Sequence, residues 1–138
     1  MRILGLDYGT KRIGVAISDE LLLTAQGMDT IQRRDITRDM KAIRDLAAEY
    51  AITEIIVGLP LSMDGSYSQK TKEVVKFIED LSKEVAVPVK TYDERLTSWE
   101  ADQIMLEANL SRQKRRSLSD RIAAQLILQG YLDNRKKG

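Results

Sequence analysis

Three acidic residues in this chain are placed so that folding could bring their carboxylates together. Asp7 directly follows an apolar run, Glu94 lies in the segment "YDER" after another such run, and Asp120 lies in a late, helix-like stretch. Carboxylate oxygens are the ligands that hard divalent cations such as Mg²⁺ and Mn²⁺ prefer. Convergence of these side chains would create a metal-binding site, so we take all three as candidate catalytic residues and metal ligands.

The composition points to the same residue types. The 138 residues contain no Cys and no His, which excludes disulfides, thiolate zinc sites, cysteine nucleophiles and imidazole bases. Acid–base and metal chemistry must then rest on Asp, Glu, Lys, Arg, Tyr and hydroxyl groups. The net charge of +1 identifies no partner by itself, so a nucleic-acid site would have to be a local basic patch.

Asp120 occupies an unusual position for a carboxylate. At about 100° per residue, the side chains that share its helix face are those of Ala123, Ala124, Ile127, Leu128 and Tyr131. An unpaired carboxylate on a core-facing stripe is costly unless it is neutralised, paired or bound to a metal. Ser117 resembles the start of a helix, so we expect Asp120 in the first helical turn, pointing toward the sheet edge that carries Asp7 and Glu94.

Each carboxylate also has a plain structural interpretation. Asp7 could be a turn former whose side chain bonds the backbone, and Glu94 could form a surface ion pair with Arg95. Asp120 could be a helix-start acid that the helix dipole favours. All three interpretations would have to hold together to remove the site, so the joint placement of the three acids favours function.

Other segments could contact phosphate. The segment "GLPLSMDGS", with Gly58, Gly65 and Ser66, could bind phosphate through backbone N–H groups or could be an ordinary loop before a helix. Lys11 and Arg12 lie beside the Asp7 turn, and a basic stretch between residues 112 and 121 could contact nucleic acid or be simply solvated. The candidate nucleic-acid-binding residues are Lys11, Arg12, Arg95, Arg112, Lys114, Arg115 and Arg116.

The hydrophobic pattern predicts the elements that would position these residues. Strands are expected at residues 2–6, 13–18 and about 24–31, the first two joined by a turn that contains Gly9. A helix with its apolar face between residues 36 and 50 precedes the short buried strand "EIIVGLP". A second helix around residues 74–85, a strand in "VPVKTYDE", a third helix that opens at Thr97 and a fourth that opens at Ser117 complete the order.

This order predicts an α/β fold, with a mixed five-stranded sheet of three antiparallel strands and then two parallel ones, flanked by helices. The length fits a single domain over residues 1–138, with a frayed tail at about 134–138. Ligand sites in such sheets form outside the carboxyl ends of the parallel strands. That rule brings Asp7, the "GLPLSMDGS" loop and Glu94 to the same edge.

Four blocks of the sequence resemble the YqgF/RuvX family, in the order that the family has them: "LDYGTKRIGVAISD", "EIIVGLPLSMDGS", "KTYDERLTSWEA" and "SLSDRIAAQLILQGYL". The resemblance runs almost end to end and implies an RNase H-like fold. Members of the family are described as Holliday junction resolvases or as nucleases that mature the 5′ end of the small-subunit ribosomal RNA precursor. By resemblance, Asp7, Glu94 and Asp120 match the family's three acidic positions, whereas Ser62 stands where many relatives have Asn.

The three carboxylates and the absence of His favour two-metal phosphodiester hydrolysis. Two Mg²⁺ or Mn²⁺ ions roughly 3.5–4 Å apart would activate a water and stabilise the leaving 3′ oxygen. Asp7 would bridge the two ions, and Glu94 and Asp120 would each complete one shell. The resemblance favours pre-16S ribosomal RNA as the substrate; a four-way DNA junction is the alternative, and symmetric cutting of a junction would need a homodimer.

Two further function classes fit part of the sequence. The opening "LDYGT" also resembles nucleotide-binding proteins of the actin and sugar-kinase group, which bind ATP between two such lobes, whereas this chain has room for one. A non-catalytic RNA-binding assembly factor would keep the fold and bind RNA without turnover. No apolar run is long enough for a membrane span or a signal peptide, so we expect a cytoplasmic protein without a membrane partner.

Overall fold

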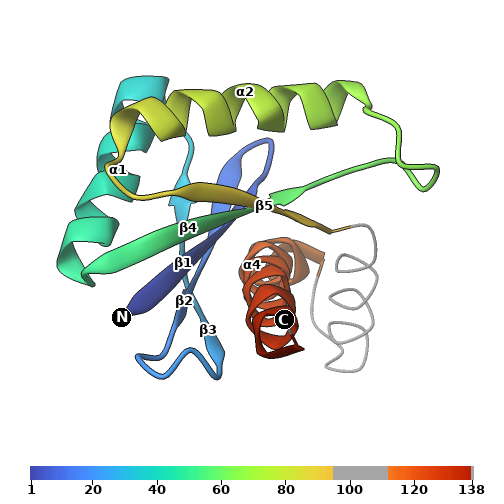
Figure 1. The fold of residues 1–138 in the computed structure, drawn as a ribbon. Coiled ribbons are helices and arrows are strands. Elements are labelled where there is room, and N and C mark those ends of the chain that lie inside the picture. The colour runs from blue at the N-terminus through green and yellow to red at the C-terminus, as the bar shows by residue number, and fades with distance from the viewer. Residues whose placement is uncertain (95–111, 138) are drawn as a thin grey trace.

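Five strands form one mixed sheet in the order β3-β2-β1-β4-β5 in the computed structural model (Figure 1). The structure describes residues 1–94 and 112–137, and in the second segment it describes the side chains of residues 120–135. β1 pairs antiparallel with β2 and β2 with β3, whereas β4 pairs parallel with both β1 and β5. The predicted sheet of three antiparallel strands followed by two parallel ones is confirmed.

The elements follow the predicted order. The strands are β1 (Arg2–Tyr8), β2 (Arg12–Ser18), β3 (Ala25–Gln32), β4 (Ile52–Leu59) and β5 (Val89–Asp93). The helices are α1 (Ile36–Glu49), α2 (Gln69–Glu84) and α4 (Arg112–Lys137). None of the described helices is both long and apolar enough to cross a membrane.

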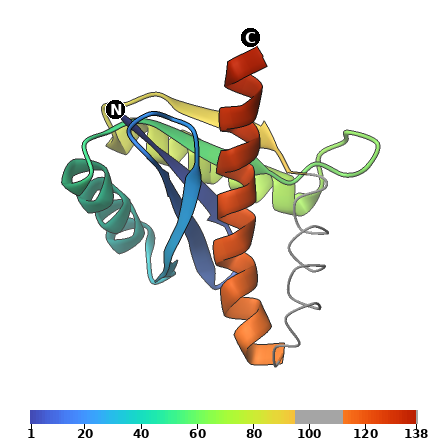
Figure 2. The same ribbon diagram turned by 90° about the horizontal axis from the view of Figure 1, so that it is seen from below.

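The helices cover the two faces of the sheet unequally. α1 and α2 lie on one face, and α4 lies across the other, where it contacts β1, β2, β3 and β4 (Figures 1 and 2). Side chains along a strand alternate between faces, so Leu4 and Leu6 of β1 point toward α1 and α2. Ile3 of the same strand belongs to the apolar cluster on the α4 face.

Side-chain caps fix where the first two helices begin. Asp35 precedes α1, and its carboxylate accepts a hydrogen bond from the backbone N–H of Arg38 at 2.9 Å. Ser68 precedes α2, and its hydroxyl accepts from the N–H of Thr71 at 3.2 Å while the Thr71 hydroxyl accepts from the N–H of Ser68. Such reciprocal caps satisfy N–H groups that the first helical turn leaves without a partner.

Two predicted boundaries near the candidate acids are wrong. β1 extends to Tyr8, so Asp7 lies inside a strand, paired with Gly14, and not in the turn after it. Ser117 does not begin a helix, because α4 already begins at Arg112 and Asp120 lies more than two turns inside it. The residues before Ser117 are mostly good helix formers without Gly or Pro, so the helix extends past the predicted cap.

Two other expectations concern segments near the C-terminal helix. α4 continues to Lys137, through most of the segment for which the sequence predicts a frayed tail. The predicted third helix, opening at Thr97, lies outside the described residues.

Candidate carboxylate active site

Asp7 reaches the α4 face because of strand periodicity. Counting along β1 in steps of two from Ile3, whose side chain packs on the α4 face, leads to Gly5 and then to Asp7. The flanking Tyr8 points to the opposite face, where its ring stacks on Phe77 of α2 with centroids 4.1 Å apart. The end of β1 is thus held by packing on one face and presents a carboxylate on the other.

Glu94 reaches the same place from the end of β5. Tyr92 packs in the apolar cluster of the α4 face, so Glu94, two residues later, lies on that face as well. Between β1 and β5 runs β4, where Gly58 is the residue level with Tyr92. A Cβ at Gly58 would lie 2.3 Å from a Glu94 carboxylate oxygen, so the missing side chain is what lets Glu94 extend over β4 toward Asp7.

Asp7 and Glu94 form a hydrogen-bonded pair of carboxyl groups with strongly perturbed acidity. Burial, together with the charge of Asp120, raises the pKa of Asp7 to about 6, although its hydrogen bond with Glu94 opposes the rise. Burial, the charge of Asp7 and the same hydrogen bond raise the pKa of Glu94 to about 8. Two ionised groups at this distance would repel each other, so the buried pair retains a proton more readily than an isolated carboxyl group does.

Asp120 is placed over β2 by another glycine. A Cβ at Gly14 would lie 2.1 Å from the backbone oxygen of Asp120, and Gly14 is the pairing partner of Asp7. The α4 backbone therefore lies directly on β2 next to Asp7. The structure brings all three predicted carboxylates, Asp7, Glu94 and Asp120, to one site, which we call the carboxylate site.

Arg12 neutralises Asp120 in this structure. Its Nε donates to Oδ2 of Asp120 at 2.8 Å, and both side chains are about one quarter exposed. A small pocket lies beside this ion pair, lined by Gly9, Thr10, Lys11, Arg12 and Asp120. The predicted proximity of Lys11 and Arg12 to the acids is therefore present in the structure, and Arg12 already contacts one of them.

Lys70 is a basic residue of the site that the sequence analysis missed. It lies in the first turn of α2, and its charge lowers the pKa of both Asp7 and Glu94. Its Nζ is buried without a hydrogen-bond partner among the described residues and lies 5.3 Å from the centroid of the Tyr8 ring. The "GLPLSMDGS" loop was the only signal that pointed to this part of the chain.

The loop before α2 uses its own backbone groups. Gly65 has φ of 85°, in the left-handed region that suits glycine, and its N–H donates to the Ser62 carbonyl oxygen at 2.7 Å. The N–H of Ser66 donates to the Asp64 carboxylate at 2.9 Å. The N–H groups expected to bind phosphate therefore have partners inside the loop, and Gly58 lies in β4 instead of the loop.

The remaining basic candidates are only partly described. Arg95 lies outside the described residues, and Arg112, Lys114, Arg115 and Arg116 lie in α4 before the residues whose side chains are described. Arg121, from the same stretch, donates to the carbonyl oxygen of Met28 and pairs with Asp29 at 2.6 Å. Its guanidinium therefore binds β3.

The donor set of the carboxylate site fits a hard divalent cation. It consists of oxygen ligands only, and Asp7 and Glu94 already hold a proton that a cation could replace. Among the described residues no three acidic side chains are grouped closely enough to form a ready metal cage, which agrees with the engagement of Asp120 by Arg12. If Arg12 released Asp120, the third carboxylate would be free to bind a cation.

Solved structures of low sequence identity share the fold. The protein named "T. thermophilus RuvC in complex with Holliday junction substrate" matches with a TM-score of 0.63 and 14% identity, over 99% of this chain and 96% of that one. The fowlpox virus resolvase, solved with Holliday junction DNA, matches with a TM-score of 0.59 and 13% identity, over 97% of this chain and 98% of that one. The chain has the RNase H-like fold of these proteins, as predicted.

Sequence relatives are much closer. A protein of Moorella thermoacetica named "Putative pre-16S rRNA nuclease" is 50% identical over 96% of this chain and 95% of its own length. A protein of Halothermothrix orenii with the same name is 48% identical over 99% of this chain and 98% of its own length. The family described as "RuvX: Holliday junction resolvase" matches residues 1–134. The chain therefore belongs to the RuvX family.

Proposed function

We propose that this protein is a nuclease that hydrolyses phosphodiester bonds with the help of divalent cations. The observation that carries the proposal is the pair of partly buried, hydrogen-bonded carboxyl groups of Asp7 and Glu94, next to Asp120. Ionisation of both carboxyl groups in a buried pair costs free energy. A cation that takes the place of the shared proton would offset that cost, so the pair suits cation binding. Membership of the RuvX family and the names of its relatives support the same chemistry.

Mg²⁺ or Mn²⁺ would be held by Asp7, Glu94 and Asp120, and two ions fit the proposal best. When bound, such ions neutralise charge on the phosphate and favour ionisation of the attacking water. Asp7 occupies the middle of the site, since it interacts with both other carboxylates, and so suits the role of shared ligand.

The chain's own cations would orient the substrate. Arg12 is bound to Asp120 in this structure, and release of its guanidinium would provide a donor for a phosphate oxygen in the adjoining pocket. Lys11 lines the same pocket and carries a second positive charge. Both residues would hold the phosphate that flanks the cleaved bond, which positions the strand without reading its bases.

Pre-16S ribosomal RNA is the substrate that we propose, because close relatives carry that name. Such a substrate places the protein in the cytoplasm. A four-way DNA junction is the second candidate, because the family is described by that activity. A junction resolvase that cuts two strands symmetrically would act as a homodimer.

Cleavage assays with three labelled substrates test the proposal: an RNA that spans a ribosomal precursor end, a linear duplex and a four-way junction. Each is incubated with Mg²⁺, Mn²⁺ or a chelator. We expect metal-dependent cleavage by the parent protein and none by Asp120→Asn. Asp45→Asn is the matched control, because Asp45 is exposed on α1 and pairs only with Lys41 in the described structure; it should cleave like the parent.

The outcomes separate the function classes. Preference for the precursor RNA supports ribosomal RNA maturation, and preference for the junction supports the second candidate. A protein that binds RNA but cleaves it with no metal, and whose RNA affinity is the same in Asp120→Asn, would contradict the nuclease proposal. That result would support a non-catalytic RNA-binding assembly factor instead.

A further inference from the structure

The end of β3 lies beside the turn that lines the Asp120 pocket. Gln32 is the pairing partner of Arg12 on β2, and the N–H of Arg33 donates to the Lys11 carbonyl oxygen at 2.9 Å. The Arg33 guanidinium donates to the carbonyl oxygens of Gly9 and Thr10 at 2.9 and 2.8 Å. It also lies 4.3 Å from the centroid of the Tyr8 ring. Arg33 therefore ties the β3 end rigidly to the β1–β2 turn.

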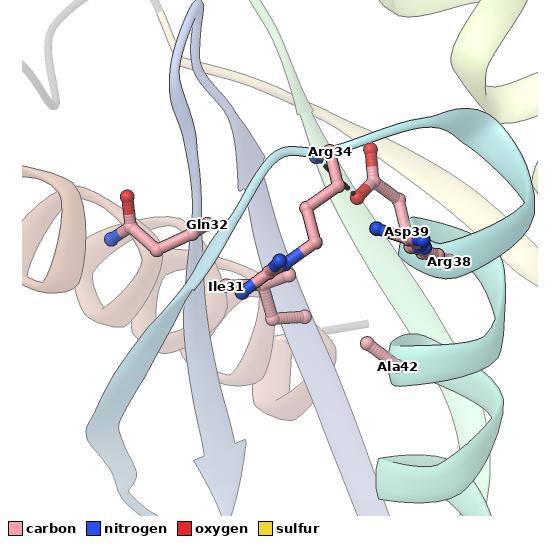
Figure 3. A pocket seen from close by; sticks show the side chains of 6 residues that line it. All are labelled: Ile31, Gln32, Arg34, Arg38, Asp39 and Ala42. Atoms are coloured by element: carbon pink, nitrogen blue, oxygen red, sulfur yellow. Dashed lines mark hydrogen bonds between the residues drawn. The ribbon is translucent and has the colours of Figure 1, made fainter.

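Three exposed cations lie on this joined structure. Lys11 is in the turn and lines the Asp120 pocket, whereas Arg34 follows β3 and Arg38 is in the first turn of α1. We call these two arginines the basic edge. A groove between β3 and α1 runs between the two arginines, and Figure 3 shows the Arg34 side chain extending back along it. The groove is lined by Ile31, Gln32, Arg34, Arg38, Asp39 and Ala42.

The acidic groups at the basic edge leave its positive charge available. Asp39 is buried, and its carboxylate accepts from the backbone N–H of Arg34 at 2.9 Å (Figure 3). Asp35 caps α1 and lies 3.4 Å from Nε of Arg38, but both of these side chains are more than half exposed, so water and salt screen the pair. Within the described part of the chain, no ion pair is formed by Lys11 or Arg34.

The position of the basic edge suits a polyanionic strand that leaves the carboxylate site. β3 is two strands away from β1, which carries Asp7, and the groove beside Arg34 and Arg38 lies between β3 and α1, on the sheet face opposite α4. A strand at the carboxylate site therefore reaches these arginines after it has passed the β1–β2 turn, with phosphates beyond the one next to the cleaved bond.

We propose that the basic edge binds the phosphodiester backbone of the substrate strand a few nucleotides from the cleaved bond. The proposal rests on the proposed function, which places the cleaved bond at the carboxylate site. The occupant is one nucleic-acid strand, RNA or DNA, because the exposed arginines offer positive charge to the phosphate backbone that both have. The strand passes the β1–β2 turn and continues around the end of β3 toward α1.

Binding at a series of salt concentrations, with chelator present to prevent cleavage, tests the basic edge. The full-length protein carries Arg34→Gln, Arg38→Gln or both, and the probes are a labelled RNA strand and a DNA strand of the same sequence. The matched control is Lys83→Gln, which removes one exposed charge at the far end of α2. Gln at position 34 keeps the backbone N–H that donates a hydrogen bond to the Asp39 carboxylate, so the fold is retained.

We expect each arginine change to lower the slope of log affinity against log salt by about 0.7, the value for one phosphate contact on a single strand. The double variant should bind both probes on the order of tenfold more weakly near 0.1 M salt, and Lys83→Gln should bind like the parent. Shortening the strand by four nucleotides on the bound side should weaken the parent and leave the double variant almost unchanged.

Equal affinity and equal slope for the double variant and Lys83→Gln would overturn the proposal. Cleavage separates this failure from failure of the proposed function. Normal metal-dependent cleavage with no effect of Arg34 or Arg38 on binding leaves the nuclease assignment standing and removes the basic edge. Loss of binding in the double variant of a protein that cleaves no substrate keeps the basic edge as a strand-binding surface and removes the nuclease assignment.

Discussion

The two faces of the sheet are built from different residues and have different tasks. The face under α1 and α2 carries large aliphatic side chains such as Leu6, Ile55 and Val57, all completely buried. The face under α4 carries Gly5 of β1, Gly14 of β2 and Gly58 of β4. A Cβ at each of these glycines would lie within 2.8 Å of an atom of α4 or Glu94.

This difference shows how one sheet combines stability with a charged site. Large side chains on the first face remove apolar surface from water, which drives folding. Small residues on the second face let α4 approach closely and leave room for three carboxylates, which a fully packed face would exclude. Truncation of a large aliphatic side chain on the first face should therefore change stability alone, and a side chain added at a glycine next to the carboxylates should change the site.

The largest effect on stability is expected from Ile55→Ala. Ile55 of β4 is completely buried under the helices of the first face. Removing its side chain leaves a cavity that lowers the free energy of unfolding by about 2–5 kcal/mol. Chemical denaturation measures this loss. Mn²⁺ affinity of the folded fraction should stay within twofold of the parent, and a loss of metal binding in folded protein would contradict the separation of the two faces.

Gly58→Ala tests the second face from the same strand. The added methyl group would lie 2.3 Å from the Glu94 carboxylate and 2.4 Å from Ile127, so we expect a loss of about 1–3 kcal/mol together with displacement of Glu94. Metal titration should show affinity at least tenfold weaker.

Gly27→Ala is the matched control for that change. Gly27 lies on β3, three strands away from β4, and its added methyl would lie 2.4 Å from Cγ of Arg121 on α4 and clear of Glu94. Metal binding should survive in this variant. Equal loss of metal binding in both variants would mean that any methyl group on this face disturbs the site.

The metal-free protein should lose stability as pH rises, and Glu94→Gln should reduce that loss. The pKa of Asp7 rises to about 6 and that of Glu94 to about 8 on folding. The folded state therefore binds more protons than the unfolded state from about pH 4 to 8, and stability falls across that range as the pH increases. Glu94→Gln removes one of the two titrations and should gain on the order of 1–2 kcal/mol at pH 8. Denaturation of the metal-free proteins at pH 5 and pH 8 measures the difference, and an identical pH dependence in parent and variant would disprove the raised pKa of Glu94.

The smallest effect is expected from Lys70→Met. The charge of Lys70 lowers the pKa of Asp7 and Glu94, so its removal should raise both pKa values. Carboxyl carbon chemical shifts followed against pH measure this change directly. Lys72→Met, an exposed neighbour on the same helix, should leave both pKa values as they are. No difference between the two variants would exclude Lys70 from the site.

The sequence was sufficient to bring the three acids together. The rule for the carboxyl ends of parallel strands brought Asp7 and Glu94 to one edge of the sheet, and the helical period placed Asp120 on the apolar side of its helix. It was not sufficient for element boundaries: β1 extends past Asp7, and the helix start predicted at Ser117 is wrong because good helix formers precede it.

The sequence also did not predict what individual small or basic residues do in the fold. Gly58 reads as part of a phosphate loop, yet its role in the structure depends on Glu94, a residue from a neighbouring strand. Lys70 reads as one more lysine on an exposed helix face, because only the docking of α2 beside β1 places its charge near Asp7. Tertiary contacts of this kind have no signature in residue spacing.

Calorimetric titration of Mn²⁺ into the parent protein and into Asp7→Asn at pH 7, in two buffers of different ionisation enthalpy, tests the central claim most directly. We predict that the parent binds Mn²⁺ and releases a proton, since the cation replaces the proton that Asp7 and Glu94 share, and that Asp7→Asn binds at least a hundredfold more weakly. Mn²⁺ binding of equal strength in both proteins, without proton release, would contradict the assignment of the carboxylate site as a metal centre.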